Sequence, residues 1–200
     1  VFSLKGDHVV SVGRDRSVKL TELATQRFID NITSITPGAL RGGIAAVARH
    51  PAKDEILVGG ADGLPQILRV FRETKRVIGD NSNLIRKFPV MEGRIFAVAY
   101  SSDGKRIVAA SSMDGEGEVN VYAADFDGTI TDELKKIFEK VAGTRTADEN
   151  KKVEEFQTKD VKLIASAKLK GGIYSVAFAP GDKQVVAAGA NGEIYYLDST

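Results

Sequence analysis

The chain has 200 residues, 42% of them hydrophobic and 28% charged, which is typical of a globular domain large enough to bury a core. Its 28 lysines and arginines nearly balance its 27 aspartates and glutamates, so the average charge argues against a surface that binds nucleic acid through many phosphate contacts. Cysteine is absent and no apolar run approaches the ~20 residues of a membrane span, which excludes disulfides, thiolate metal sites, cysteine nucleophiles and a spanning helix within these residues.

A repeated pattern begins at the N-terminus and recurs along the chain. The stretch from Phe2, FSLKGDHVVSVGRDR, matches the stretch from Phe178, FAPGDKQVVAAGANG. Residues 42–63, GGIAAVARHPAKDEILVGGADG, align without a gap with residues 171–192, GGIYSVAFAPGDKQVVAAGANG. Such matches indicate a tandem-repeat protein. The alternative is an unrelated all-β sandwich in which the similarity is accidental.

A further copy, GRIFAVAYSSDGKRIVAA, starts at Gly93 and shows the internal order of the unit. Residues 95–100 predict a short strand, a tight turn follows, and residues 107–110 predict a second strand of small and β-branched side chains. One extra residue precedes the second turn of this copy. In every unit that turn carries an acid or an amide that tolerates turn dihedrals, namely Asp15, Asp62, Asp114 or Asn191. A third strand follows in each unit, at 18–20, 67–71, 119–122 and 194–197. Three units also have a more polar fourth strand, at 27–32, 84–88 and 161–165.

Four short strands in each unit of about 40–50 residues predict the blade of a β-propeller. Small side chains in the second strand let neighbouring blades approach closely near the axis. The phrases IFAVAYSSDGKRIVAASS and IYSVAFAPGDKQVVAAGANGEIYYLD resemble WD40 repeats. The resemblance implies an all-β, WD40-like β-propeller segment of about four repeats with an α-helical hairpin insertion. The repeats are expected at about residues 1–38, 39–90, 91–168 and 169–200.

The repeats depart from the usual WD40 pattern in two ways. The chain contains no tryptophan, and the Trp-Asp pair that usually ends the third strand is replaced by Thr21-Glu22, Tyr122-Ala123 and Leu197-Asp198. The Gly-His pair before the first strand is also missing. The hydrogen-bond relay that supports many WD40 blades is therefore incomplete, and we interpret the repeats as divergent ones of a bacterial type.

The first unit lacks the start of its first strand, and the last unit stops after its third strand. Closed propellers usually have four to eight blades, and an open half-propeller exposes blade faces and unpaired strand edges. The sequence therefore predicts a partial propeller from a larger multidomain protein, with further blades outside these residues. A small four-bladed ring that shares strands between its ends is the alternative.

Residues 125–160 interrupt the third unit between its third and fourth strands. Helical spacing over one part of this insertion predicts a first helix, with Leu134, Ile137, Phe138 and Val141 on one face. Gly143 is placed to end that helix.

Thr146 and Glu149 have the spacing of a capping box for a second, highly charged helix. Val153 and Phe156 are its main apolar side chains. We expect the two helices to form a hairpin, which either packs on the side of the propeller or docks a neighbouring domain.

The insertion begins with Asp125-Phe126-Asp127-Gly128-Thr129, which matches the first motif, DxDGT, of haloacid-dehalogenase-type phosphatases. In that family the first Asp attacks phosphorus, the second transfers protons, and Mg²⁺ lies between carboxylates. Here the preceding strand belongs to a repeat, and no later lysine and acidic pair completes such a site. We interpret the segment as a turn that leads into a helix, and phosphatase chemistry through Asp125 and Asp127 is a remote alternative.

Two groups of basic residues fall outside the predicted core. One group, expected in loops on a single face, comprises Arg14, Arg16, Arg41 and Arg94. These arginines would either form a rim that binds an acidic protein partner or carry solvated charges. A solvated strand end is expected for the other, Arg69, Arg72, Lys75 and Arg76. The two histidines form no cluster, and the sequence predicts no catalytic, cofactor-binding or metal-binding residue.

Propellers hold their loops on a rigid ring, and the loops carry the contacts. The resemblance therefore implies a non-catalytic interaction or structural scaffold, whose partners are proteins or neighbouring domains of the same chain, without nucleic acid. The alternative is an accessory propeller of a bacterial surface protein that also carries a c-type haem domain. No Cys-x-x-Cys-His occurs here, so no haem attaches within these residues. Only that alternative points to a location outside the cytoplasm.

Overall fold

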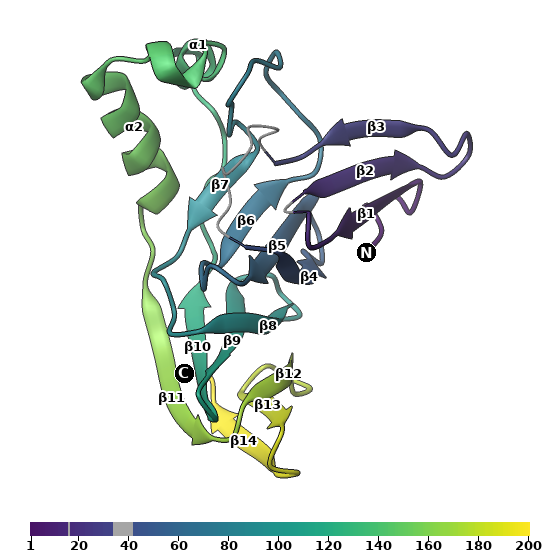
Figure 1. Cartoon of the computed structure of the whole chain (residues 1–200), viewed down its shortest axis with the longest axis vertical. Helices are drawn as coiled ribbons and strands as arrows, with labels where there is room; N and C mark the ends of the chain where they lie inside the picture. The colour runs from purple at the N-terminus through teal and green to yellow at the C-terminus, as the bar shows by residue number, and fades with distance from the viewer. Residues whose placement is uncertain (16, 34–41) are drawn as a thin grey trace.

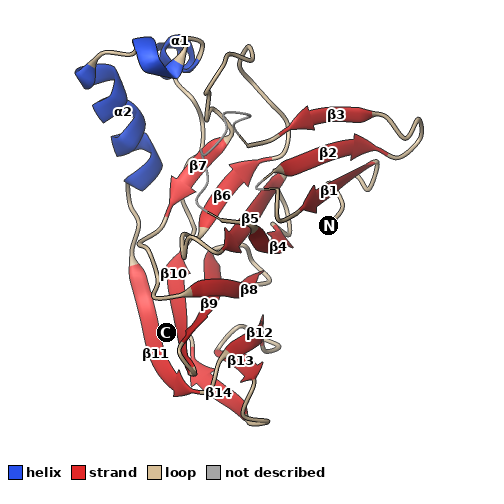
Figure 2. Ribbon diagram, in the orientation of Figure 1, coloured by secondary structure: helices blue, strands red, loops and turns tan. Residues whose placement is uncertain are grey.

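The computed structural model describes residues 1–15, 17–33 and 42–200. Within them, four antiparallel sheets follow one another in chain order and stack face to face (Figures 1 and 2). We call them blades 1 to 4. Blade 1 contains β1 (His8–Val12), β2 (Val18–Glu22) and β3 (Phe28–Asn31). Blade 2 contains β4 (Ile44–Arg49), β5 (Glu55–Gly60), β6 (Gln66–Arg69) and β7 (Leu84–Lys87). Blade 3 contains β8 (Arg94–Tyr100), β9 (Arg106–Met113), β10 (Glu116–Ala123) and β11 (Leu163–Lys170). Blade 4 contains β12 (Ile173–Phe178), β13 (Gln184–Gly189) and β14 (Ile194–Asp198).

The strand order within each blade follows the sequence. Blades 2 and 3 each have four strands, in the orders β4-β5-β6-β7 and β8-β9-β10-β11. The described part of blade 1 begins with β1, which is equivalent to β13, and a single bridge between Phe2 and Val9 precedes it. Blade 4 has the order β12-β13-β14. The all-β architecture of about four repeats that the sequence predicts is confirmed.

The core lies between the blades, because successive side chains of a strand point to opposite faces. Ile56 and Leu57 of β5 illustrate this alternation, since both are fully buried in different clusters. Ile56 packs with Val10 and Leu20 of blade 1. Leu57 packs with Ile107 of blade 3. A middle blade therefore contributes to two interfaces with one strand, which explains the apolar composition of the second strands.

Glycine ends the second strand of blades 2 and 4 because the main chain of the innermost strand passes very close to it. A Cβ on Gly60 would lie 2.1 Å from the carbonyl oxygen of Gly43. A Cβ on Gly189, the equivalent position, would lie 1.8 Å from the carbonyl oxygen of Gly172. No side chain fits at these distances, so the small residues noted in the sequence have a steric reason.

The helical insertion lies between β10 and β11, as predicted, and consists of α1 (Asp132–Phe138), the 3₁₀ helix η1 (Ala142–Thr144) and α2 (Ala147–Thr158). The capping box of α2 is present. The Thr146 hydroxyl accepts a hydrogen bond from the Glu149 N–H at 3.2 Å, and the Glu149 carboxylate accepts one from the Thr146 N–H at 2.9 Å. Val153 is buried against α1, and Phe156 packs beside it. In the described part of the chain, no helix is long and apolar enough to cross a membrane.

The first helix is shorter than the sequence predicts. It ends at Phe138, Val141 lies outside it, and Gly143 falls inside η1 instead of ending α1. The physical reason is Arg145, whose guanidinium donates hydrogen bonds to the carbonyl oxygens of Ile137 at 3.0 Å and Phe138 at 3.3 Å. These bonds satisfy carbonyl groups that another helical turn would otherwise occupy.

Candidate binding site between blade 2 and the helical hairpin

A buried arginine attaches the hairpin to blade 2. Arg86 of β7 is only 2% exposed, and its Nη1 donates to the carbonyl oxygen of Phe156 at 2.5 Å. Phe156 lies in the last turn of α2, where free carbonyl groups and the helix dipole favour a cation. Nη2 donates to the carbonyl oxygen of Asp127 at 3.2 Å, and the guanidinium lies 4.2 Å from the ring centroid of Phe126. Burial lowers the pKa of Arg86.

The DxDGT segment is a strap across the edge of blade 2. The carbonyl oxygen of Gly128 accepts a hydrogen bond from Arg69 at 2.6 Å. The Asp127 carboxylate accepts one from the Thr129 N–H at 2.8 Å. Hydrogen bonding to the Thr129 side chain and N–H lowers the pKa of Asp127. The Asp125 carboxylate pairs with Lys105 at 3.3 Å. The two carboxylates thus have separate partners. Over residues 1–15, 17–33 and 42–200, no group of three or more His, Cys, Asp or Glu could hold a metal ion.

The arginines of the basic run that starts at the end of β6 form ion pairs, so the expectation of a solvated strand end is wrong for Arg72. Its Nε lies 3.0 Å from the Asp30 carboxylate of blade 1, and its Nη1 lies 2.7 Å from the Asp80 carboxylate. Arg76 also pairs with Asp30. Arg69 is mostly buried as well, at 11% exposed, and pairs with Glu73. The sequence does not reveal this because Asp30 belongs to a different blade.

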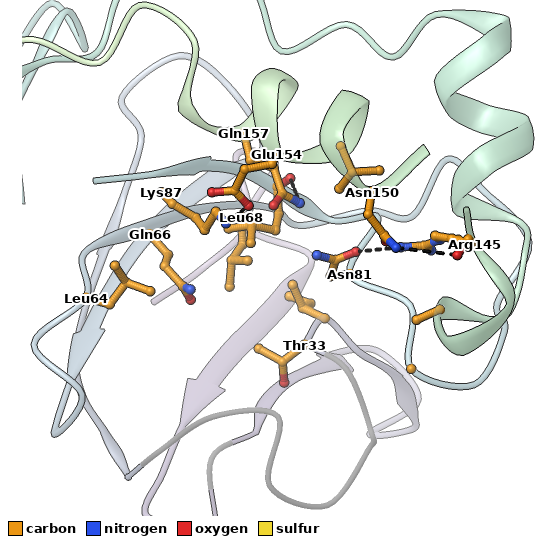
Figure 3. Close-up of a pocket in the computed structure, with 15 residues that line it drawn as sticks. Thr33, Leu64, Gln66, Leu68, Asn81, Lys87, Arg145, Asn150, Glu154 and Gln157 are labelled. Atoms are coloured by element: carbon orange, nitrogen blue, oxygen red, sulfur yellow. Dashed lines mark hydrogen bonds and ion pairs between the residues drawn. The ribbon is translucent and has the colours of Figure 1, made fainter. Parts of the chain in front are cut away.

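A cavity of about 590 Å³ lies between blade 2, the end of blade 1 and the hairpin (Figure 3). Strands β6 and β7 form one wall, and η1, the residue after it, and α2 form the other. Its apolar lining comprises Ile32, Leu64, Leu68, Leu84, Ala142 and Val153. Its polar lining comprises Thr33, Gln66, Asn81, Lys87, Arg145, Asn150, Glu154 and Gln157.

Gln66 is the unusual member of this lining. It is 7% exposed, it faces the cavity (Figure 3), and no described residue makes a hydrogen bond to its amide. Equivalent positions in the other blades have partners. In blade 3 the Asn120 amide donates to Glu118 at 2.7 Å, and in blade 4 the Tyr195 hydroxyl donates to the carbonyl oxygen of Lys170 at 3.1 Å.

The cations of the cavity have different surroundings. Lys87 forms an ion pair with Glu154 across the cavity. Arg145 donates to main-chain carbonyl groups and lies 3.5 Å from the amide oxygen of Asn81, and no described carboxylate lies within ion-pair distance of it. Burial lowers the pKa of Arg145. The charged side chains of the lining, Lys87, Arg145 and Glu154, therefore include one more cation than anion.

The sequence did not indicate this cavity, because its walls come from segments as distant as Ile32 and Gln157. The two described arginines of the expected rim, Arg14 and Arg94, do not line this cavity. Arg14 is exposed in the turn between β1 and β2, and Arg94 is exposed at the start of β8. Arg16 and Arg41 lie outside the described residues. The rim accordingly stays a prediction.

The residues of the repeat turns serve the main chain. In three of them the side-chain oxygen accepts a hydrogen bond from the N–H two positions later, at 3.1–3.3 Å, namely in Asp15, Asp62 and Asn191. The Lys19 hydrogen bond lowers the pKa of Asp15 to about 2, whereas burial raises the pKa of Asp62. Asp114 and Gly115 both have positive φ, 52° and 83°, which suits the two-residue hairpin of the longer strands β9 and β10.

Residues 82–116 match the family model described as WD domain, G-beta repeat. They run from just before β7 to the start of β10 and include a complete inner pair of strands. This part of the chain is therefore similar to a WD40 repeat. The chain is also similar in structure to a chain in the crystal structure of the mitotic checkpoint complex, with a TM-score of 0.62 and 11% sequence identity. The match covers 100% of this chain and 46% of the other, so this chain spans about half the length of that one. At this identity the likeness establishes the fold alone. No curated protein sequence matches the chain.

Proposed function

We propose that this WD40 chain is a non-catalytic protein-interaction scaffold and that it forms part of a larger protein. The observation that carries the proposal is the open face of blade 4. Val119 and Val121 of β10 are 2% and 3% exposed because blade 4 covers them. The equivalent residues of β14, Ile194 and Tyr196, are 63% and 65% exposed.

The open face has the chemistry of the faces that are covered. Full burial of an aliphatic or aromatic side chain contributes about 1.5–3 kcal/mol, so two such side chains in water are a considerable driving force for association. Contiguous exposed apolar residues mark interaction surfaces in soluble proteins. The occupant that fits best is a further blade, since blades already cover the matching faces of blades 2 and 3.

The rest of the molecule suits a platform. Arg86 and Arg69 fix the strap and α2 to blade 2, and the pairs of Arg72 join blade 2 to blade 1. A rigid frame of this kind holds loops and grooves in place for partners. Of the two carboxylates of the strap, Asp125 forms a surface ion pair and Asp127 stabilises a turn, which supports a structural role for the DxDGT segment.

A first test addresses catalysis. The chain is assayed for phosphate release from p-nitrophenyl phosphate with and without Mg²⁺. We expect no release above the protein-free blank, and no difference between the wild type and Asp125→Asn. Release that requires Mg²⁺ and disappears in Asp125→Asn would contradict the non-catalytic function.

A second test addresses the open face. We expect the 200-residue chain to bind a hydrophobic dye such as ANS and to self-associate at micromolar concentrations in sedimentation velocity. Replacing Ile194 and Tyr196 together with serine should lower both signals. The matched control replaces two exposed apolar residues of β3, Phe28 and Ile29, with serine and should lower them less. Equal effects of the two double variants would argue against an interface on blade 4.

A further inference from the structure

We propose that the cavity beside the hairpin binds a short acidic peptide segment, through one aliphatic side chain and the main-chain amides that flank it. The inference rests on the proposed scaffold function and names the chemistry of one partner. It concerns a different surface from the open face of blade 4, so the two proposals can fail separately.

The apolar lining of the cavity indicates which kind of peptide side chain binds there. Leu64, Leu68 and Leu84 of blade 2 face Val153 of α2 across the cavity. No aromatic ring belongs to the described lining, so a nucleobase or another flat ring has no stacking partner there. A volume of about 590 Å³ lies within the usual range for ligand sites. An aliphatic side chain with part of its main chain fits this shape and chemistry.

The side-chain amides of the cavity are suited to bind the main chain of a peptide. Gln66 is 7% exposed and has no hydrogen-bond partner among the described residues. Gln157 is also buried, and its Nε2 reaches the carbonyl oxygen of Leu84 only at 3.5 Å, which is a long and weak hydrogen bond. A carboxamide offers a donor and an acceptor side by side, as a peptide group does. Two such groups, Gln66 on the blade wall and Gln157 on the hairpin wall, are complementary to the amides of an extended peptide that lies between them.

The charge of the cavity indicates which kind of residue stands next to the aliphatic residue of the peptide. Lys87 is neutralised by Glu154. By contrast, Arg145 donates hydrogen bonds to carbonyl and amide oxygens and lies 5.6 Å from the ring centroid of Phe138. Asp80 and Glu149 act on Arg145 at longer range, so a carboxylate of the partner would form an ion pair that no described side chain now makes. An acidic residue next to the aliphatic one is therefore preferred over a basic one.

The test is an NMR titration of the ¹⁵N-labelled chain with a blocked pentapeptide, acetyl-alanyl-glutamyl-leucyl-leucyl-alanine amide. We expect saturable shifts of the Gln66 side-chain amide and of main-chain amides in β6 and α2. A peptide with glutamine in place of glutamate should bind several-fold more weakly, and salt should reduce that difference.

Two variants make the test specific. Gln66→Leu removes the Gln66 amide and keeps an apolar fill, so the chain should stay folded and bind roughly tenfold more weakly. Gln184→Leu, an exposed glutamine of β13 far along the chain, is the matched control and should bind like the wild type. Gln66→Glu places a carboxylate in the cavity and should also weaken binding, with the folded spectrum as the check.

Three results would overturn the proposal. These are no saturable shifts at millimolar peptide, shifts that are unchanged in Gln66→Leu, or shifts confined to the open face of blade 4. The last result would leave the scaffold function standing with a different docking surface. Conversely, binding at Gln66 together with a failed dye test on blade 4 would support this site and contradict the larger propeller.

Discussion

Buried guanidinium groups join segments of this chain that are distant in sequence. Arg86 connects β7 to the last turn of α2, and Arg72 connects blade 2 to Asp30 of blade 1. A buried cation without partners is costly. Each arginine is therefore compatible with one arrangement of its neighbours, and the hairpin and the first blade acquire defined positions from these few side chains.

Replacing Arg86 with methionine should remove the cap of α2 and leave the carbonyl groups of Phe156 and Asp127 without donors. The expected loss of unfolding free energy is about 2–4 kcal/mol, measured by urea denaturation. Arg49→Met, an exposed arginine of the same blade, is the control and should change stability little. If both variants have the wild-type midpoint, Arg86 does not hold the hairpin.

The Arg72 network predicts a dependence of stability on acid. Burial raises the pKa of Asp80, but the Arg72 hydrogen bond and the N–H groups of Val77 and Ser82 outweigh it, so the pKa lies below the ordinary 3.8. A carboxyl with a lowered pKa in the folded state contributes stability that is complete above its unfolded pKa of about 3.9 and is lost as the pH falls through the folded value.

Asp80→Asn should therefore be less stable than the wild type at pH 7 and should lose less stability between about pH 4 and pH 2. Urea denaturation at several pH values measures both quantities. Parallel stability curves for the two proteins would show that Asp80 does not contribute through its charge.

At the scale of the elements, local patterns were sufficient where a neighbouring residue decides the structure. The capping box of Thr146 and Glu149 and the repeat strands follow from nearby side chains, and both were predicted. The end of α1 was predicted too late, because Arg145 ends it by reaching back to Ile137. The cavity beside Gln66 also escaped the sequence, since only the docking of the hairpin creates it.

The capping box allows a direct measurement on one element. Thr146→Ala should cost about 1 kcal/mol and should speed amide hydrogen exchange mainly in the first turn of α2. Thr158→Ala is the control, because its hydroxyl bonds back to the carbonyl oxygen of Glu154 within the helix and adds little stability. Faster exchange throughout the blades in Thr146→Ala would mean that the hairpin is not a separate unit.

At the scale of the whole molecule, the four blades are copies that use the same positions against each neighbour. Val121 of blade 3 is covered and its equivalent Tyr196 of blade 4 is open. The repeat that the sequence shows predicted the blades themselves. It could not supply the identity of a partner, because loops and grooves differ from blade to blade.

The most direct test of the scaffold account is a photo-cross-link from the open face in the full-length protein in its own cells. Benzoylphenylalanine is placed at position 196 and, as a control, at the exposed position 28 of β3. The account predicts an efficient cross-link from Tyr196→benzoylphenylalanine to an apolar strand of the same polypeptide, identified by peptide mapping, and little product from Phe28→benzoylphenylalanine. Equal and weak cross-linking at both positions would show that the face of blade 4 stays open to water and would contradict the account.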